Sequence, residues 1–530
     1  MRKFAKVRLC SAAFAKVHLC KRHCVYAQTF YIKEDNQMKK RILASLLALC
    51  MFIAVAPISA LAADPVTTEE ELLAAVENGG EITLGASLTQ SIVIPAGKTV
   101  ILNLNGNTLT NNGSTDTITV EKGASLTVTG SGIVKNTADG RGAVFNNGTA
   151  ELNGGRYERT GEWYVLLNHG SMIIGDGVQV VSESTYSSMI ENGYQNYNSG
   201  NASTGYVLET NAANPSLTIN GGSFSGGLNT VKNDDGGKLE INGGRFSNVS
   251  QAVVLNWNTA TITGGDFTVT EPGVNSVILN GFADSTLDTG KLEIKGGTFT
   301  STTGAPVLTT MGGATHSGDV NISGGTLNGD IVLTDAYTGG KLEISETAVI
   351  NGDVINQKAA SVTVTGGSVT GQVSNNGNGK ITITGGTFPN ADISDFVDSS
   401  TIAIITFNSN GGSAVATQVV AKNNSISLPT TTRSGYNFLG WYLNDSRVGG
   451  HNDSYKVTGN VTLVARWNYI NQGGGTTEPS GDYQVTVDRT TGGKISVSPS
   501  RADKGDTVTI TVKPDKGYEL DKLIVTNKDG

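Results

Sequence analysis

Aromatic and acidic side chains gather between Tyr157 and Tyr206, where an otherwise regular spacing of glycine pairs is interrupted. Exposed rings can stack on the apolar faces of sugars while carboxylates bond to the hydroxyl groups. The polar loop Ser184–Gly205 is longer than an ordinary turn, and loops of that length are often functional. The alternative is a surface loop that folds down on its own tyrosines. The candidate ligand-binding residues are Trp163, Tyr164, Tyr186, Glu191, Tyr194 and Tyr197.

Two further motifs could belong to a hydrolase or a lyase. Asp234 and Asp235 are adjacent and precede a glycine pair, and His169 follows an asparagine that recurs along the chain. Adjacent acids are common in turns, however, and no arginine or lysine cluster accompanies these residues. Spacing alone does not bring two carboxylates to the separation that glycosidases need. The sequence therefore predicts no catalytic residue, no cofactor and no metal site.

The charge and the cysteines restrict the compartment and the partners. All four cysteines lie before Ala62, so the chain after this point can form no disulfide. The same part of the chain has 27 basic and 44 acidic side chains, a net charge of −17. An acidic surface disfavours nucleic acid and anionic membranes as partners. A long secreted protein without cysteine suggests a Gram-positive bacterium.

The N-terminal region contains a secretion signal rather than a domain. Residues 1–37 are expected to be an upstream start assigned too early. Residues 38–62 form the signal peptide, with basic Lys39–Arg41, an apolar core over Ile42–Val55 and the cleavage motif Ala60-Leu-Ala62. A retained membrane anchor is the alternative, because Ile42–Ala63 could span a bilayer. No transmembrane segment is expected in the mature chain.

The chain after the signal is organised around a short repeated unit, of which Leu217-Thr-Ile-Asn-Gly-Gly-Ser-Phe224 is one copy. Alternating apolar residues indicate a strand, the glycine pair bends the chain, and the phenylalanine begins another strand. Spacings of 19 to 22 residues between glycine pairs are typical of a solenoid. Stacked coils would align the phenylalanines in an internal ladder. An apolar pair followed by Asn or Thr recurs in motifs such as Val254-Leu-Asn256, Val307-Leu-Thr309 and Val332-Leu-Thr334, and stacked coils would align these residues in a hydrogen-bonded ladder.

A capping-box helix over Thr68–Glu77 is in the right place to cover the first coil. The fold class predicted is mainly β, with a solenoid over residues 64–398. This region resembles right-handed parallel β-helix proteins of the pectin-lyase-like class, a resemblance of architecture and not of a catalytic motif. Members of that class include polysaccharide lyases and glycoside hydrolases. Residues 63–398 hold 33 acidic and 14 basic side chains, so a polyanion such as pectin would be repelled.

Residues 399–469 contain a different module, with the motifs Ile404–Gly412, Arg433–Tyr442 and Val461–Trp467. They resemble the Listeria–Bacteroides repeat, also called the internalin B-repeat. The resemblance implies a small mixed α/β fold of the β-grasp type on a bacterial surface protein, without known catalytic residues. Five aromatic side chains supply enough apolar area for the core of about 70 residues.

Residues 470–481 form a flexible linker, and residues 482–530 resemble a divergent B-repeat that stops before the usual last strands. The expected protein is a secreted, cell-surface, non-enzymatic adhesin-like or structural protein. Its β-helix would serve as a rigid display or glycan-binding rod. Its partners would be a host or environmental glycan or surface protein, and the cell wall through a region beyond residue 530. The alternative is a secreted polysaccharide-active enzyme.

Overall fold

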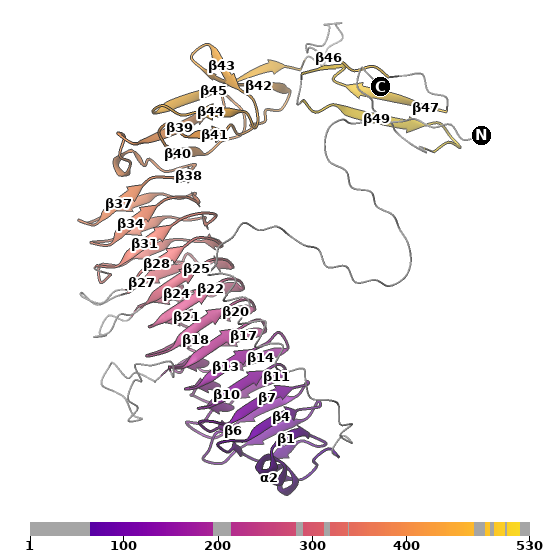
Figure 1. The fold of residues 1–530 in the computed structure, drawn as a ribbon, viewed down its shortest axis with the longest axis vertical. Helices are drawn as coiled ribbons and strands as arrows, with labels where there is room; N and C mark the ends of the chain where they lie inside the picture. The colour runs from indigo at the N-terminus through magenta and orange to yellow at the C-terminus, as the bar shows by residue number, and fades with distance from the viewer. Residues whose placement is uncertain are drawn as a thin grey trace, which may run out of the picture. The chain divides into compact units, whose positions relative to one another are not determined.

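The computed structural model describes residues 64–193, 214–281, 290–311, 318–337, 339–470, 483–487, 492–503 and 506–519. The expectations for residues 1–37 and 38–62 lie outside these ranges. The described chain is mainly β, and residues up to 470 form one compact unit, separate from the C-terminal unit. Figure 1 shows the first unit beginning with helix α2 and continuing as a stack of short strands. The predicted fold class is confirmed.

Helix α2 (Glu69–Asn78) begins with the predicted capping box. The Thr68 side chain accepts a hydrogen bond from the Glu71 N–H, and the Glu71 carboxylate accepts one from the Thr68 N–H. The helix buries Leu72 and Val76 in the same core as the first coils. It therefore covers apolar side chains that would otherwise face water at the start of the solenoid.

The solenoid has three parallel sheets, and each coil contributes one strand to each sheet. Sheet 1 has 13 strands: β1 (Gly80–Thr83), β4 (Thr99–Asn103), β7 (Ser125–Thr129), β10 (Thr149–Leu152), β13 (Ser171–Ile174), β16 (Ser216–Ile219), β19 (Lys238–Ile241), β22 (Thr259–Ile262), β25 (Lys291–Ile294), β28 (Val320–Ile322), β31 (Lys341–Ile344), β34 (Ser361–Val364) and β37 (Lys380–Ile383).

Sheet 2 follows sheet 1 in every coil, and in most coils a glycine pair joins the two strands. Sheet 2 comprises β2 (Leu88–Thr89), β5 (Thr108–Asn111), β8 (Ile133–Asn136), β11 (Gly155–Arg159), β14 (Val178–Ser182), β17 (Ser223–Gly226), β20 (Arg245–Asn248), β23 (Asp266–Val269), β26 (Thr298–Ser301), β29 (Thr326–Asn328), β32 (Val349–Ile350), β35 (Ser368–Val369) and β38 (Gly386–Phe388).

Sheet 3 completes each coil and leads back to sheet 1. Its 12 strands are β3 (Ile92–Ile94), β6 (Ile118–Val120), β9 (Val144–Asn146), β12 (Leu166–Asn168), β15 (Ile190–Asn192), β18 (Asn229–Asn233), β21 (Ala252–Asn256), β24 (Ser276–Asn280), β27 (Leu308–Thr310), β30 (Ile331–Leu333), β33 (Val354–Asn356) and β36 (Val373–Asn375).

The two glycines of a repeat are required for different reasons. The second glycine has a left-handed backbone, with φ of +106° at Gly265. The first approaches the preceding coil so closely that a Cβ on Gly264 would lie 2.4 Å from the Asn242 carbonyl oxygen. Side chains at either position would therefore open the corner between sheets 1 and 2.

Both predicted ladders are present. The rings of Phe224, Phe246, Phe267 and Phe299 stack with centroids 4.7 Å apart. The side-chain amides of sheet 3 donate from each coil to the next, with nitrogen–oxygen distances of 2.7 to 2.8 Å. This ladder comprises Asn146, Asn168, Asn192, Asn233, Asn256 and Asn280.

The predicted continuation of the asparagine ladder was wrong by one residue in two coils. The motifs Val307-Leu-Thr309 and Val332-Leu-Thr334 suggest Thr309 and Thr334 as its next members. In the structure Asn280 is paired with Thr310, and Thr310 with Leu333. The inward-facing residue decides the register, because Leu308 and Ile331 must enter the core.

Between β19 and β31, the outer face of sheet 1 has lysine and glutamate side chains on every second coil. Lys238 and Glu240 lie on β19, Lys291 and Glu293 on β25, and Lys341 and Glu343 on β31. The paired positions on the intervening strand β22 are threonines. Charges of one sign are therefore kept two coils apart.

Residues 401–470 form a β-module that is described throughout and contains no helix, unlike the mixed α/β fold that the resemblance implies. Its strands are β39 (Ile402–Asn408), β40 (Thr417–Ala421), β41 (Ser425–Ser427), β42 (Tyr436–Leu443), β43 (Ser446–Gly449), β44 (Ser454–Lys456) and β45 (Val461–Tyr469). A parallel pair, β39 with β45, lies at its centre. Trp441 is fully buried and donates from Nε1 to the Pro429 carbonyl oxygen.

This module also closes the end of the solenoid. Strand β40 pairs antiparallel with β38, the last strand of sheet 2, as well as with β39. Ile402 and Val419 belong to the solenoid core, together with Ile393, which precedes the short helix η2 (Ser394–Phe396). The hydrophobic core therefore continues across residue 398.

The C-terminal unit has antiparallel pairs in its described part. Strand β46 (Tyr483–Gln484) pairs with β48 (Arg501–Ala502), and β47 (Gly493–Ser498) pairs with β49 (Thr509–Pro514). The predicted linker and the last residues of this module lie outside the described ranges.

Candidate functional site

Two stacked turns lead from sheet 2 into strands β12 and β15 of sheet 3, within the stretch that the sequence selects. Glu162 in the first turn holds the second. Its carboxylate accepts hydrogen bonds from the Ser184 hydroxyl and from the Tyr186 N–H, the latter at 3.1 Å. The Ser184 hydroxyl bond, followed by backbone N–H donors of the same turn, keeps the pKa of Glu162 below its usual value. We call residues 162–164 and 184–187 the aromatic corner.

The three predicted aromatic side chains of the aromatic corner differ in how far they are exposed to solvent. Tyr186 has 81% of its surface exposed, although its backbone is fixed by Glu162. Trp163 is half-buried and meets Tyr164 edge to face, with centroids 5.2 Å apart. Tyr164 is buried, contrary to the expectation of an exposed ring. The two remaining candidates, Tyr194 and Tyr197, lie outside the described residues.

Glu191 also departs from the prediction, because no part of its side chain is exposed. It points outward from β15, and its register neighbour on β18 is Lys232. Lys232 Nζ lies 3.4 Å from Glu191 Oε1 and 2.5 Å from Asp234 Oδ2. The same ammonium group lies 4.2 Å from the centre of the Trp257 ring. We call Glu191, Lys232, Asp234 and Trp257 the lysine cluster.

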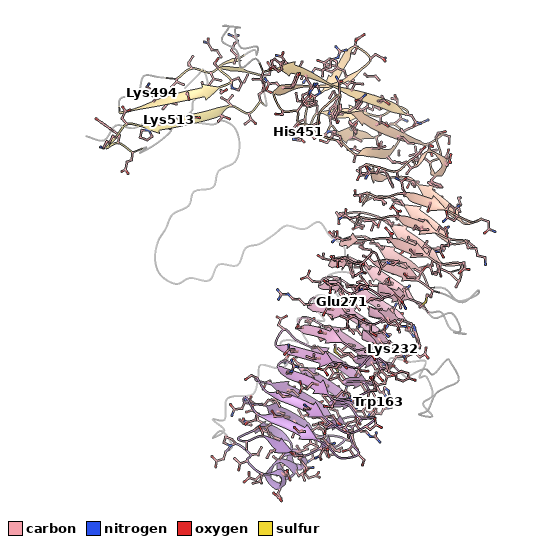
Figure 2. The ribbon with its side chains drawn as sticks, turned by 180° about the vertical axis from the view of Figure 1, so that it is seen from behind. Trp163, Lys232, Glu271, His451, Lys494 and Lys513 are labelled. Atoms are coloured by element: carbon pink, nitrogen blue, oxygen red, sulfur yellow. The ribbon has the colours of Figure 1, made fainter. Side chains whose placement is uncertain are left out.

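The lysine cluster lies on the same side of the solenoid as Trp163 (Figure 2). Side chains of the outward row on neighbouring strands are apolar: Leu167 on β12, Leu255 on β21 and Leu279 on β24. Leu255 and Leu279 form a small apolar cluster separate from the main core, with Trp257 and Met311 packed against it. Two carboxylates and a lysine are thus enclosed beside leucines of the neighbouring strands.

Burial controls the protonation of this region. Desolvation raises the pKa of Glu191 well above its usual value, and Lys232 opposes this only partly. Lys232 is itself desolvated, but Glu191 and Asp234 together raise its pKa. Glu191 Oε2 accepts no hydrogen bond from the described residues. A protonated Glu191 can donate from this oxygen to Asp234, so we assign the cluster as a neutral acid beside a lysine–aspartate ion pair.

His169 lies in the row that contains Asp234, with Gly193 on the coil between them. It follows Asn168 of the ladder, as the sequence suggests, and its ring meets Phe145 edge to face at 5.1 Å. Desolvation lowers the pKa of His169 to about 4, although Asp234 acts in the opposite direction. His169 is therefore a neutral side chain at physiological pH.

The sequence reasoning missed Lys232 and gave Asp234 no role. The motif Val231-Lys232-Asn233 has the pattern of Val254-Leu255-Asn256, with a lysine at the outward position. A lysine in a row of leucines is the signal that could have identified the cluster.

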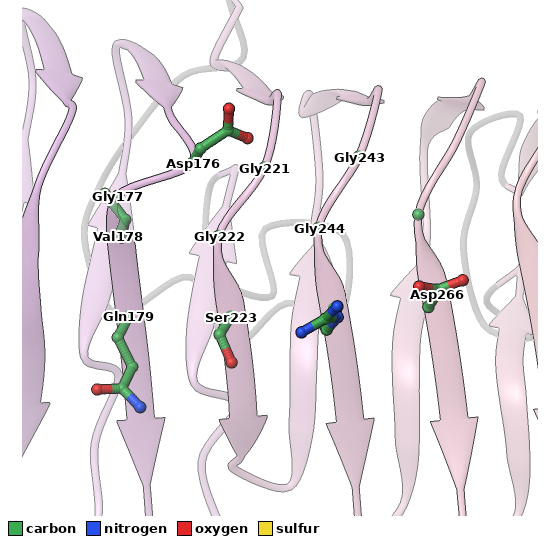
Figure 3. Close-up of a pocket in the computed structure, with 12 residues that line it drawn as sticks. Asp176, Gly177, Val178, Gln179, Gly221, Gly222, Ser223, Gly243, Gly244 and Asp266 are labelled. Carbon is green, nitrogen blue, oxygen red and sulfur yellow. The ribbon is translucent and has the colours of Figure 1, made fainter.

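A separate open groove of about 500 Å³ follows the glycine turns between sheets 1 and 2. Asp176, Arg245 and Asp266 line it, and Figure 3 shows Gln179, Ser223 and Asp266 on parallel strands of sheet 2 beside the turns. Its walls are mostly glycine backbone. The groove lacks the exposed aromatic surface of the aromatic corner.

The described residues contain no group of three or more His, Cys, Asp or Glu placed to hold a metal ion. Within the same ranges, no helix is both long and apolar enough to cross a membrane.

Comparisons with known families support the two C-terminal resemblances. Residues 404–466 match the Listeria-Bacteroides repeat domain, and residues 483–529 match the Divergent InlB B-repeat domain. Both matches lie C-terminal to the solenoid. No curated protein and no solved structure matches the chain.

Proposed function

We propose that this chain is a secreted, non-enzymatic adhesin-like protein of a bacterial cell surface, whose solenoid binds a glycan at the aromatic corner. The coarser part of this statement has support from the family matches, because Listeria-Bacteroides repeats are typical of surface proteins. Secretion, a Gram-positive source and attachment to the cell wall are parts of the proposal.

The observation that carries the proposal is the presentation of Tyr186. Here the Tyr186 N–H and the Ser184 hydroxyl are both tied to Glu162 of the preceding turn. Most of the ordering of this backbone is therefore present before a ligand arrives, which lowers the entropic cost of binding.

A glycan suits the chemistry of this corner. Tyr186 offers an apolar face and a phenolic hydroxyl, and the half-buried Trp163 lies in the turn of the adjacent coil. Sugar rings stack on such faces through their C–H surfaces. An uncharged or basic glycan is favoured, because the solenoid is strongly acidic.

A glycan array probed with the full chain tests the proposal. We expect binding that falls about fivefold or more in the Tyr186→Ala and Trp163→Ala variants, since stacking on one ring contributes on the order of 1 kcal/mol or more. Tyr518→Ala is the matched control, because this tyrosine is 65% exposed in the C-terminal unit. Glycan binding that is unchanged in the Trp163/Tyr186 double variant would refute the site.

The alternative function is a secreted polysaccharide lyase or glycoside hydrolase. The neutral acid Glu191 is the observation in its favour, since glycosidases use a carboxyl group with a raised pKa as a general acid. Glu191 has no exposed surface, however, so a substrate would have to displace its cover. Release of reducing sugars or unsaturated products from any polysaccharide would refute the non-enzymatic proposal.

A further inference from the structure

The lysine cluster is not used by the proposed glycan site and needs its own explanation. Enclosing a lysine and two carboxylates is costly, and an ion pair often recovers only part of this cost. An apolar side chain at position 232 would continue the row of Leu167, Leu255 and Leu279. Packing alone therefore does not explain the cluster, and a chemical role would.

We propose that Lys232 and Glu191 form an intramolecular isopeptide bond, with Asp234 as the proton carrier. The bond would join the neighbouring strands β15 and β18 from side chain to side chain. Because the two residues are 41 positions apart, the bond would also close the long insertion between these strands. Nothing in this proposal depends on the glycan site.

The geometry supplies the proximity that amide formation requires. Lys232 Nζ lies 3.4 Å from Glu191 Oε1, which is one C–O bond from the carboxyl carbon that the nitrogen would attack. The two residues are register partners on parallel strands, so neither strand has to move. Both side chains are buried, which holds them together and limits the water that would hydrolyse an intermediate.

The three ionisable groups have complementary roles. Asp234 accepts a proton from the Lys232 ammonium group, to which it is bonded at 2.5 Å. The resulting amine attacks the carboxyl carbon of Glu191 and forms the C–N bond. Asp234 then gives its proton to the departing hydroxyl group, the C–O bond breaks and water leaves. A second proton passes from the nitrogen to Asp234, so the products are an amide, one water and a neutral Asp234.

Glu191 is the better acyl group of the two carboxylates. Amine attack needs the neutral carboxylic acid, and burial keeps Glu191 in that form. Asp234 is instead the ion-pair partner of the ammonium group and so the natural proton acceptor. A Lys232–Asp234 amide would link residues two positions apart in the same coil and would join no coils.

Intact mass spectrometry of the purified full chain tests the proposal. The expected mass is lower by one water than the mass calculated from the N-terminus found in the same sample. Trypsin should fail to cleave after Lys232, and fragmentation should identify one branched peptide that contains Glu191 and Lys232. The Asp234→Asn variant should form this linkage roughly 100-fold more slowly, the lower range for loss of a general acid–base group.

The chain contains its own matched control. Lys295 Nζ lies 2.7 Å from Glu293 Oε2, but both side chains are partly exposed, at 53% and 33%. This pair should remain unlinked in the same digest, because water solvates both groups. A far-UV spectrum shows whether Glu191→Ala, which must lose the linkage, remains folded.

Three results would overturn the proposal. The first is a wild-type mass that equals the calculated mass after complete folding. The second is a linkage of Lys232 to Asp234 instead of Glu191. The third is an Asp234→Asn variant that folds and forms the Glu191 linkage at the wild-type rate.

Discussion

Replacement of Asn256 by alanine tests whether the internal amide ladder stabilises the solenoid. Asn256 is fully buried. Its Nδ2 donates to Asn280 Oδ1 at 2.7 Å and to the Lys291 carbonyl oxygen at 3.1 Å, and its Oδ1 accepts from Asn233 Nδ2 at 2.8 Å. Each such bond contributes about 1 kcal/mol net, so the variant should lose about 2–4 kcal/mol of unfolding free energy.

Urea unfolding measures this loss, and hydrogen exchange followed by mass spectrometry locates it. Coils of a solenoid contact mainly their neighbours, so exchange should accelerate in β18, β21 and β24 and remain unchanged in β3, β6 and β9. Asn242→Ala is the matched control. Its Nδ2 donates to Asn220 Oδ1 at 3.0 Å, but this bond is exposed, and the variant should lose less than about 0.5 kcal/mol.

A loss at Asn256 no larger than at Asn242 would refute the reasoning, because burial would then add nothing to an amide–amide bond. Faster hydrogen exchange in every coil would instead contradict the expectation that the effect is confined to neighbouring coils.

Three further predictions use the same unfolding measurements. Phe267→Ala should cost about 3–5 kcal/mol, whereas Phe267→Leu should cost clearly less because Leu327 occupies the same row. Equal costs would contradict the expectation that an aliphatic side chain can fill this position. A fragment of residues 64–398 should unfold at a lower urea concentration and self-associate in sedimentation experiments. It lacks β40 and the core side chains Ile402 and Val419, and burial of each side chain contributes about 1.5–3 kcal/mol. A 64–398 fragment as stable as a 64–470 fragment would contradict the capping role of the β-module. His169 has a pKa of about 4 when folded against 6.5 when unfolded, so its contribution to the unfolding free energy is present above pH 6.5 and lost as the pH falls to 4. His169→Gln should remove about 3 kcal/mol of this pH dependence. An unchanged dependence of the unfolding free energy on pH would refute the assignment of a buried, neutral His169.

The ladders could be predicted from the sequence because parallel coils stack in register. A residue type that recurs at one place in the repeat must then recur at one place in the structure, as Phe246 and Phe267 do. The wrong prediction that Thr309 continues the asparagine ladder also came from matching residue types along the repeat. Val307-Leu-Thr309 resembles Val254-Leu-Asn256 in sequence, but its inward-facing residue is Leu308, which is paired with Ile278.

The lysine cluster could not be predicted because its residues meet only after the chain has closed a coil of unusual length. Glu191 and Lys232 are 41 positions apart, whereas most ladder partners are separated by 22 to 24. The sequence does not reveal how much of the intervening segment belongs to the coil. The sequence suggested Tyr186 as a candidate, but its fixation by Glu162 depends on side-chain contacts between turns.

The charges on the outer face of sheet 1 have a consequence for how this solenoid can change its length. Removal of the coil that contains β22 would place Lys238 beside Lys291 and Glu240 beside Glu293, at the spacing of adjacent strands, about 4.8 Å. Like charges that face each other across neighbouring strands are destabilising. Removal of two coils would restore the alternation of charged and uncharged strands. Natural variants of this protein should therefore gain and lose coils in pairs.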